Sequence, residues 1–210
     1  MALTRLNNNA IGETITAAKG GTGVTSADSI GNLVKLQSVN VTSNVSSVDF
    51  DSTYITSDYD VYKIIVRGIL PATDSVDFFM RYSIDGGSTF ISTSNYPMVC
   101  LDANESTTNG NIDTRMDTSQ NGIRLTGQSG NQGSADGERS SGEITFFNSN
   151  NTLKIVQSQF TYFFTDNRLV YSSTSQCLDA SRTDTVNGLR FFYNSGDIAS
   201  GELILYGVKT

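Results

Sequence analysis

The feature that most constrains the fold is a two-residue alternation of apolar and polar side chains. In residues 61–70 (VYKIIVRGIL), one face holds Tyr62, Ile64 and Val66. In residues 76–83 (VDFFMRYS), one face holds Val76, Phe78, Met80 and Tyr82, and the opposite face holds Asp77, Arg81 and Ser83. Because successive side chains of a strand point to opposite faces of a sheet, this period indicates half-buried β-strands. No window of useful length shows the 3.6-residue period and the caps of a helix, so the sequence predicts an all-β protein.

Turn sequences follow both of these segments. The first is followed by residues 71–74 (PATD), where proline favours a turn, and the second by residues 85–88 (DGGS), which predict a tight hairpin and a return strand from Phe90. Further strands are expected at 33–42, 122–127, 143–147, 153–165, 168–173, 186–193 and 202–209. Shared faces are expected for Ser158, Phe160, Tyr162 and Phe164, and for Leu189, Phe191 and Tyr193. About eight to ten such strands suit an antiparallel, jelly-roll-like β-sandwich.

Composition divides the chain into an extended N-terminal arm, residues 1–32, and a β-sandwich domain, residues 33–210. The arm is rich in Gly, Thr and Ala and has too few aliphatic side chains for a core of its own. Such a segment becomes ordered by docking onto a partner. The side chains expected to be buried in that contact are Leu3, Leu6, Ile11 and Ile15. Within the domain, residues 102–141 form a polar excursion longer than an ordinary loop.

Several function classes are excluded or disfavoured by residue counts. The chain has no histidine, which excludes Ser-His-Asp and Cys-His catalysis and imidazole metal ligands. Its net charge of −7 disfavours nucleic-acid binding. The apolar runs are too short to span a membrane, and the first ten residues lack the apolar stretch of a secretory signal. For Cys100 and Cys177, two buried thiols are favoured over a disulfide, because the chain has the character of a cytoplasmic product.

Two motifs invite a chemical interpretation. Asp49 and Asp51 precede Tyr54, and Asp58 and Asp60 follow it. Carboxylates two residues apart on a strand point the same way, as Ca²⁺ binding or glycoside hydrolysis requires, but no EF-hand spacing is present and solvated turn residues are the favoured interpretation. Residues 19–23 (KGGTG) lack the order of a phosphate-binding loop. No catalytic residue, metal ligand or cofactor is therefore assigned.

A recognition surface is the last candidate. Glycan-binding surfaces combine aromatic faces with short polar side chains, because sugars present both C–H patches and hydroxyls. The polar excursion and five scattered tyrosines offer both: Tyr54, Tyr59, Tyr96, Tyr162 and Tyr171. The alternative, favoured for any single residue, is that the tyrosines fill the core and that the excursion is solvated or packs between subunits. The receptor or glycan surface is left unassigned.

Several segments resemble a recurring domain of tailed-bacteriophage virion proteins. They are residues 59–66 (YDVYKIIV), 70–74 (LPATD), 80–90 (MRYSIDGGSTF), 188–192 (GLRFF), 195–201 (SGDIASG) and 205–209 (LYGVK). The KGGTG element of the arm is similar to segments of many phage tail-fibre chains. The resemblance covers most of residues 33–210.

The resemblance implies a β-sandwich knob in the virion, often trimeric, made in the host cytoplasm and attached by its arm to a tail adaptor, nozzle or capsid. The leading interpretation is a tail fibre or receptor-binding-type protein that binds a host-surface glycan and is not an enzyme. The chain has no coiled coil or long repeat for a shaft, which favours a compact knob. A capsid fibre or decoration protein with a purely architectural role is the alternative. A glycan depolymerase, which requires a carboxylate pair in a groove, is the third.

Overall fold

The computed structural model describes residues 32–93, 96–105, 111–126, 131–149, 154–165, 168–177 and 184–209. The expected arm lies outside these ranges except for Asn32, so the predicted docking residues Leu3, Leu6, Ile11 and Ile15 are not among the described residues. The same holds for the KGGTG element.

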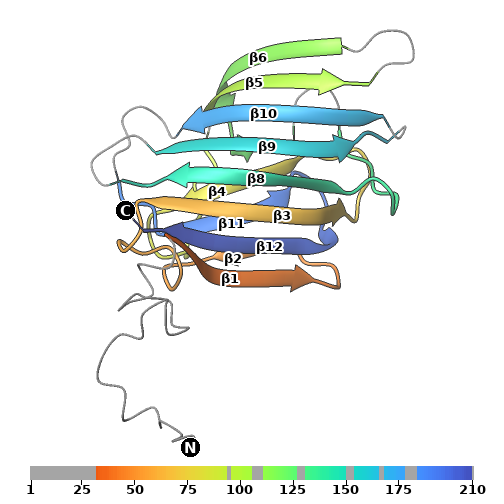
Figure 1. Ribbon diagram of the computed structural model, residues 1–210. Helices are drawn as coiled ribbons and strands as arrows, with labels where there is room; N and C mark the ends of the chain where they lie inside the picture. Colours follow the sequence, from red (N-terminus) through yellow and green to blue (C-terminus); the bar gives the residue numbers. More distant parts are fainter. Residues whose placement is uncertain are drawn as a thin grey trace, which may run out of the picture.

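The described chain forms two antiparallel sheets packed face to face (Figure 1), which confirms the predicted all-β sandwich. The eight-stranded sheet has the order β1-β12-β3-β8-β9-β10-β5-β6, and the four-stranded sheet has the order β2-β11-β4-β7. The strands are β1 Leu33–Val41, β2 Val48–Phe50, β3 Val61–Pro71, β4 Phe78–Ser83, β5 Tyr96–Asn104, β6 Asn111–Gln120, β7 Ile123–Arg124, β8 Ser140–Phe147, β9 Ile155–Phe163, β10 Leu169–Cys177, β11 Gly188–Tyr193 and β12 Ile198–Val208. Among the described residues there is no helix with the length and apolar character needed to cross a membrane.

The core lies between the two sheets and is rich in aromatic side chains. Phe78 of β4 packs edge-on against Phe160 of β9 with 6.2 Å between ring centroids, and Tyr82 of β4 lies 5.3 Å from Phe146 of β8. These pairs join the small sheet to the large one, and each adds about 0.5–1.5 kcal/mol beyond the area it buries. The alternating faces predicted from the sequence are all buried: Tyr62, Ile64 and Val66; Val76, Phe78, Met80 and Tyr82; Ser158, Phe160, Tyr162 and Phe164; and Leu189, Phe191 and Tyr193. Tyr162 and Phe164 belong to a second, smaller cluster with Val170.

Strand β4 is buried on both faces, which the half-buried prediction did not anticipate. It begins at Phe78, because Val76 makes only an isolated bridge to Gln132. On the face predicted to be polar, Asp77 and Ser83 are both buried. Ser83 accepts a hydrogen bond from the Gly87 N–H at 2.9 Å, so the turn that follows β4 covers it.

The DGGS turn forms as predicted but does not make a hairpin. Gly86 and Gly87 have φ of 77° and 94°, values that favour glycine. After the turn the chain crosses to the other sheet, since β4 belongs to the four-stranded sheet and β5 to the eight-stranded one. The return strand expected from Phe90 is reduced to one hydrogen bond, from the Ile91 N–H to the Tyr82 carbonyl at 2.9 Å. The next strand, β5, begins at Tyr96.

The polar excursion predicted at residues 102–141 contains more strand than expected. The strand predicted at 122–127 is present as the short β7, but residues 111–120 form a second strand, β6, which pairs with β5 at the edge of the large sheet. Strand β6 is held by backbone pairing with β5, and its two large apolar side chains, Ile112 and Met116, are exposed rather than buried. Hydrophobic patterning alone therefore could not reveal it.

Strand β12 carries a glycine that its close contact with β3 requires. The register of β12 and β3 shifts on either side of Ser200, and Gly201 has a φ of 132°. A Cβ atom on Gly201 would lie 2.6 Å from the Cα of Ile69 on β3. Both the backbone conformation and the available space therefore exclude a side chain here.

We expect Gly201→Ala to lower the free energy of unfolding by about 2–4 kcal/mol, because it combines backbone strain with a contact to main-chain atoms that cannot move aside. Gly137→Ala is the matched control, since nothing lies within 4 Å of a Cβ built there. Urea unfolding measures both variants. Equal stabilities would contradict this account of the β3–β12 contact.

Candidate functional site

Three of the four acidic residues singled out from the sequence bind neighbouring groups of the fold, and the fourth, Asp60, is exposed. Asp49 forms a two-bonded ion pair with Arg190, at 2.6 and 2.9 Å, across the β2–β11 pairing. Asp51 accepts the Thr53 N–H at 2.9 Å, and Asp58 accepts the Thr56 hydroxyl at 3.2 Å. In the part of the chain that the structure describes, no group of three or more Asp, Glu, Cys or His side chains is placed to hold a metal ion.

The tyrosines and cysteines do not gather into one site. Tyr96 and Tyr162 are fully buried and Tyr54 and Tyr59 are half-buried, so only Tyr171 is exposed, at 40%. The favoured interpretation of the tyrosines as core residues therefore holds for most of them.

The two cysteines form no disulfide, and Cys100 is buried as predicted, but Cys177 is only half-buried. The register places Cys100 opposite Thr174 on β10, so Cys177, three residues further along β10, points to the other face of the sheet. Side chains on opposite faces cannot be bridged.

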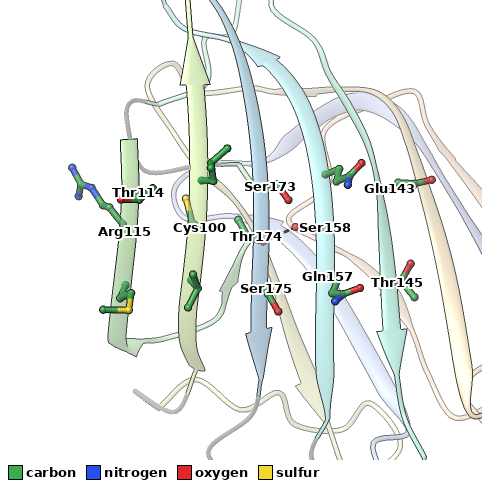
Figure 2. Close-up of a pocket in the computed structure, with 14 residues that line it drawn as sticks. Cys100, Thr114, Arg115, Glu143, Thr145, Gln157, Ser158, Ser173, Thr174 and Ser175 are labelled. Atoms are coloured by element: carbon green, nitrogen blue, oxygen red, sulfur yellow. Dashed lines mark hydrogen bonds between the residues drawn. The ribbon is translucent and has the colours of Figure 1, made fainter. Parts of the chain in front are cut away.

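The candidate site is a hollow of about 740 Å³ on the outer face of the eight-stranded sheet, away from the core. Figure 2 shows side chains of five adjacent strands around it, from β6 through β5, β10 and β9 to β8. Its outward-facing side chains form two cross-strand rows. One row contains Met116, Val99, Ser175, Gln157 and Thr145, and the other contains Thr114, Leu101, Ser173, Gln159 and Glu143.

The middle of this groove is polar but uncharged. Gln157 and Gln159 on β9 are exposed, and Ser173 and Ser175 lie opposite them on β10. Each amide offers two donors and an acceptor, and each hydroxyl offers both functions. At the β8 end, the carboxylate of Glu143 is paired with Lys63 of β3 at 2.8 Å. The groove thus presents a dense set of hydrogen-bonding groups with little net charge.

Apolar side chains bound the polar middle. Val99 and Leu101 on β5 lie toward the sheet edge and are 58% and 43% exposed. Along the strands, Tyr171 lies on one side, two residues from Ser173, and the opposed pair Phe147 and Ile155 lies on the other. The stretch of β9 between these two limits is six residues, or roughly 20 Å.

The floor of the groove rests on a second polar layer inside the sandwich. Ser158 and Thr174 share a hydrogen bond of 2.6 Å between β9 and β10. The side-chain amide of Gln176 donates to the Arg124 carbonyl at 2.7 Å and accepts the Arg124 N–H at 3.2 Å, which links β10 to β7 of the other sheet. Because β9 and β10 are polar on both sides here, they lack the alternation that would have marked this face as a surface.

A buried acid completes this inner layer. Asp77 is 4% exposed, and its Oδ2 pairs with the Arg124 guanidinium at 3.1 Å. Its Oδ1 has no hydrogen-bond donor among the described residues. Burial raises the pKa of the Asp77 carboxyl to about 6, against the lowering effect of Arg124 and with a further raising effect from Asp102.

This pKa predicts how stability depends on pH. Since the Asp77 pKa is about 6 in the folded state and 3.8 is its ordinary value, the folded protein binds the proton more tightly. Proton binding by Asp77 therefore contributes on the order of 3 kcal/mol to the free energy of unfolding below pH 4, and this contribution is lost as pH rises through 6. We expect Asp77→Asn to abolish this decline in urea unfolding measured between pH 4 and 7.

The matched control is Asp136→Asn, because the side chain of Asp136 is 90% exposed. Its pH profile should follow the wild type. An unchanged decline in the Asp77→Asn protein would show that another group is responsible.

The sequence predicts no particular recognition surface. Of the side chains that line or border the groove, Tyr171 is the one that the sequence offered as a recognition residue. The available signal was the run of outward polar side chains at alternate positions of β9: Gln157, Gln159 and Thr161. The chain matches no protein-family model, no curated protein and no solved structure.

Proposed function

We propose that the protein is a tail-fibre or receptor-binding-type component of a tailed-bacteriophage virion that binds a host-surface glycan through the groove of the eight-stranded sheet. The observation that carries the proposal is the groove itself: an open hollow whose middle is lined by uncharged amides and hydroxyls, on a sandwich of the kind the resemblance implies. A rigid sheet that displays recognition groups at low cost in conformational entropy suits binding.

The chemistry of the groove favours a neutral, polyhydroxylated ligand. Sugar hydroxyls donate and accept hydrogen bonds, as do Gln157, Gln159 and Ser173. The C–H faces of sugar rings suit the aliphatic surface of Val99 and Leu101. The charged lining residues among those described are Glu143, which is neutralised by Lys63, and Arg115, so neither a polyanion nor a polycation is matched by the site.

Binding fits the lining better than hydrolysis does. Most glycosidases place two carboxyl groups across the scissile bond, about 5–10 Å apart. Of the described residues around the groove, Glu143 is the one carboxylate, so the second carboxyl group of a glycosidase pair has no counterpart among them.

We expect the double variant Gln157→Ala/Gln159→Ala to bind host surface polysaccharide about 5- to 100-fold more weakly, because each lost amide removes hydrogen bonds worth about 0.5–1.5 kcal/mol. Isothermal titration with purified polysaccharide measures the affinity. Asn44→Ala removes an exposed amide away from the groove and should bind like the wild type.

Two outcomes of this experiment would contradict the proposal. Undiminished binding by the double variant would remove the groove from recognition, and absence of binding by the wild-type protein would favour the architectural capsid role. Shortened polysaccharide chains after incubation would instead identify a depolymerase.

Attachment to the particle is proposed to depend on the arm, residues 1–32. Burial of Leu3, Leu6, Ile11 and Ile15 against neighbouring virion subunits would offset part of the cost of ordering the segment. Deletion of residues 1–32 should leave a folded domain that keeps its glycan affinity but is absent from purified particles. Incorporation of the deleted protein at wild-type levels would overturn the assignment.

A further inference from the structure

We infer that the protein self-associates by antiparallel pairing of β6 with β6 of a second copy, about a twofold axis that passes beside Thr114. Strand β6 ends the eight-stranded sheet (Figure 1), and among the described residues it pairs only with β5. An edge strand presents backbone N–H and C=O groups to any strand of suitable register. The inference stands independently of what the groove binds.

The shape of β6 suits strand addition better than that of the opposite edge. Its pairing with β5 is regular from Asn111 to Asp117, without a bulge. The other edge of the sheet, β1, has a register irregularity between Lys35 and Gln37, and Lys35 lies at it. Bulges and charged side chains, lysine above all, protect an edge from pairing; the segment of β6 from 111 to 117 has no bulge, and its charged residues Asp113 and Arg115 are of opposite sign.

The sequence of β6 is complementary to itself in this arrangement. With Thr114 opposite Thr114 of the second copy, Asp113 lies opposite Arg115 and Ile112 lies opposite Met116, and symmetry makes each pair occur twice. Centring the axis on Arg115 or on Asp113 instead would oppose two like charges. If the axis passed between two residues instead of through one, side chains on the outer face of one copy would lie opposite side chains on the inner face of the other. Charge and face thus favour the Thr114-centred register over the registers half a residue and one residue away.

An aliphatic patch supports the same register. Met116 and Ile112 are 83% and 69% exposed, which makes them the most exposed large apolar side chains in the described chain. Val99 and Leu101 extend this patch onto β5. Pairing of β6 with its copy would bring the two patches together in one strip across the axis, which accounts for apolar side chains on an otherwise solvated edge. Figure 2 shows Arg115 on the side of β6 that faces away from β5, where the second copy would lie.

The twofold axis would be perpendicular to the sheet, so both outer faces would point the same way. Two grooves would then lie on one side of a continuous sheet, and a polymeric ligand would engage both with increased avidity. This consequence rests on the proposed function, but the association does not. The arrangement differs from the threefold assembly that the family resemblance implies.

Charge substitutions in β6 test the inference on the full-length protein by sedimentation equilibrium. R115D places aspartates opposite one another and D113R places arginines opposite one another, so each alone should raise the dimer dissociation constant roughly tenfold or more. A mixture of the two single variants should form a heterodimer, and the double variant D113R/R115D should regain the homodimer. K35D, the same change of charge on the β1 edge, should dimerise like the wild type.

Cross-linking gives a readout that does not depend on charge. In T114C the introduced thiol would face its own copy across the axis, so mild oxidation should yield a disulfide-linked dimer on a non-reducing gel. T145C places a thiol on the same face but on β8, away from the edge, and should stay monomeric on the gel, as should the wild type. The inference would be overturned if the wild-type protein were monomeric, or if it formed a trimer that R115D leaves unchanged. It would also be overturned if the double variant kept the wild-type melting temperature but did not regain the dimer.

Discussion

The aromatic contacts between β4 and the large sheet are the interaction on which the rest of the structure depends. Phe78 against Phe160 and Tyr82 against Phe146 place the hydrophobic core on one face of the eight-stranded sheet. Because the apolar residues of β3, β8 and β9 point to that face, their alternate residues must point outward. A large, open sheet face is therefore a direct consequence of where the core lies.

The two sheets differ in width, and this difference shapes the proposed site. Four strands cannot cover eight, so toward β10 and β5 the aromatic core gives way to a polar layer that includes Ser158, Thr174 and Gln176. The hydrogen bonds of Ser158, Thr174 and Gln176 pair these buried polar side chains and hold the groove floor in one conformation. Because the small sheet is narrower, it does not cover β6, which lies at the edge of the large sheet. The sequence of β6 suits pairing with β6 of a second copy.

Most strands that pack on the core were predictable from the sequence, whereas the edge strand β6 and the short core strand β2 were missed. Tyr62, Ile64 and Val66 revealed β3 because burial imposes the two-residue period on them. Strand β6 has no buried face, β2 is three residues long, and the crossing of the chain from β4 to β5 depends on tertiary packing that a turn sequence does not encode. The groove was missed because Gln157 and Gln159 become neighbours of Ser173 and Val99 only when β9, β10 and β5 are placed side by side.

A crystal structure of the protein with an oligosaccharide from the host surface would show whether the outer face of the large sheet binds a glycan. We expect sugar rings over β9 and β10, with hydroxyls hydrogen-bonded to Gln157, Gln159 and Ser173. Sugars bound on the four-stranded sheet, or an empty groove in crystals grown with saturating ligand, would contradict this expectation.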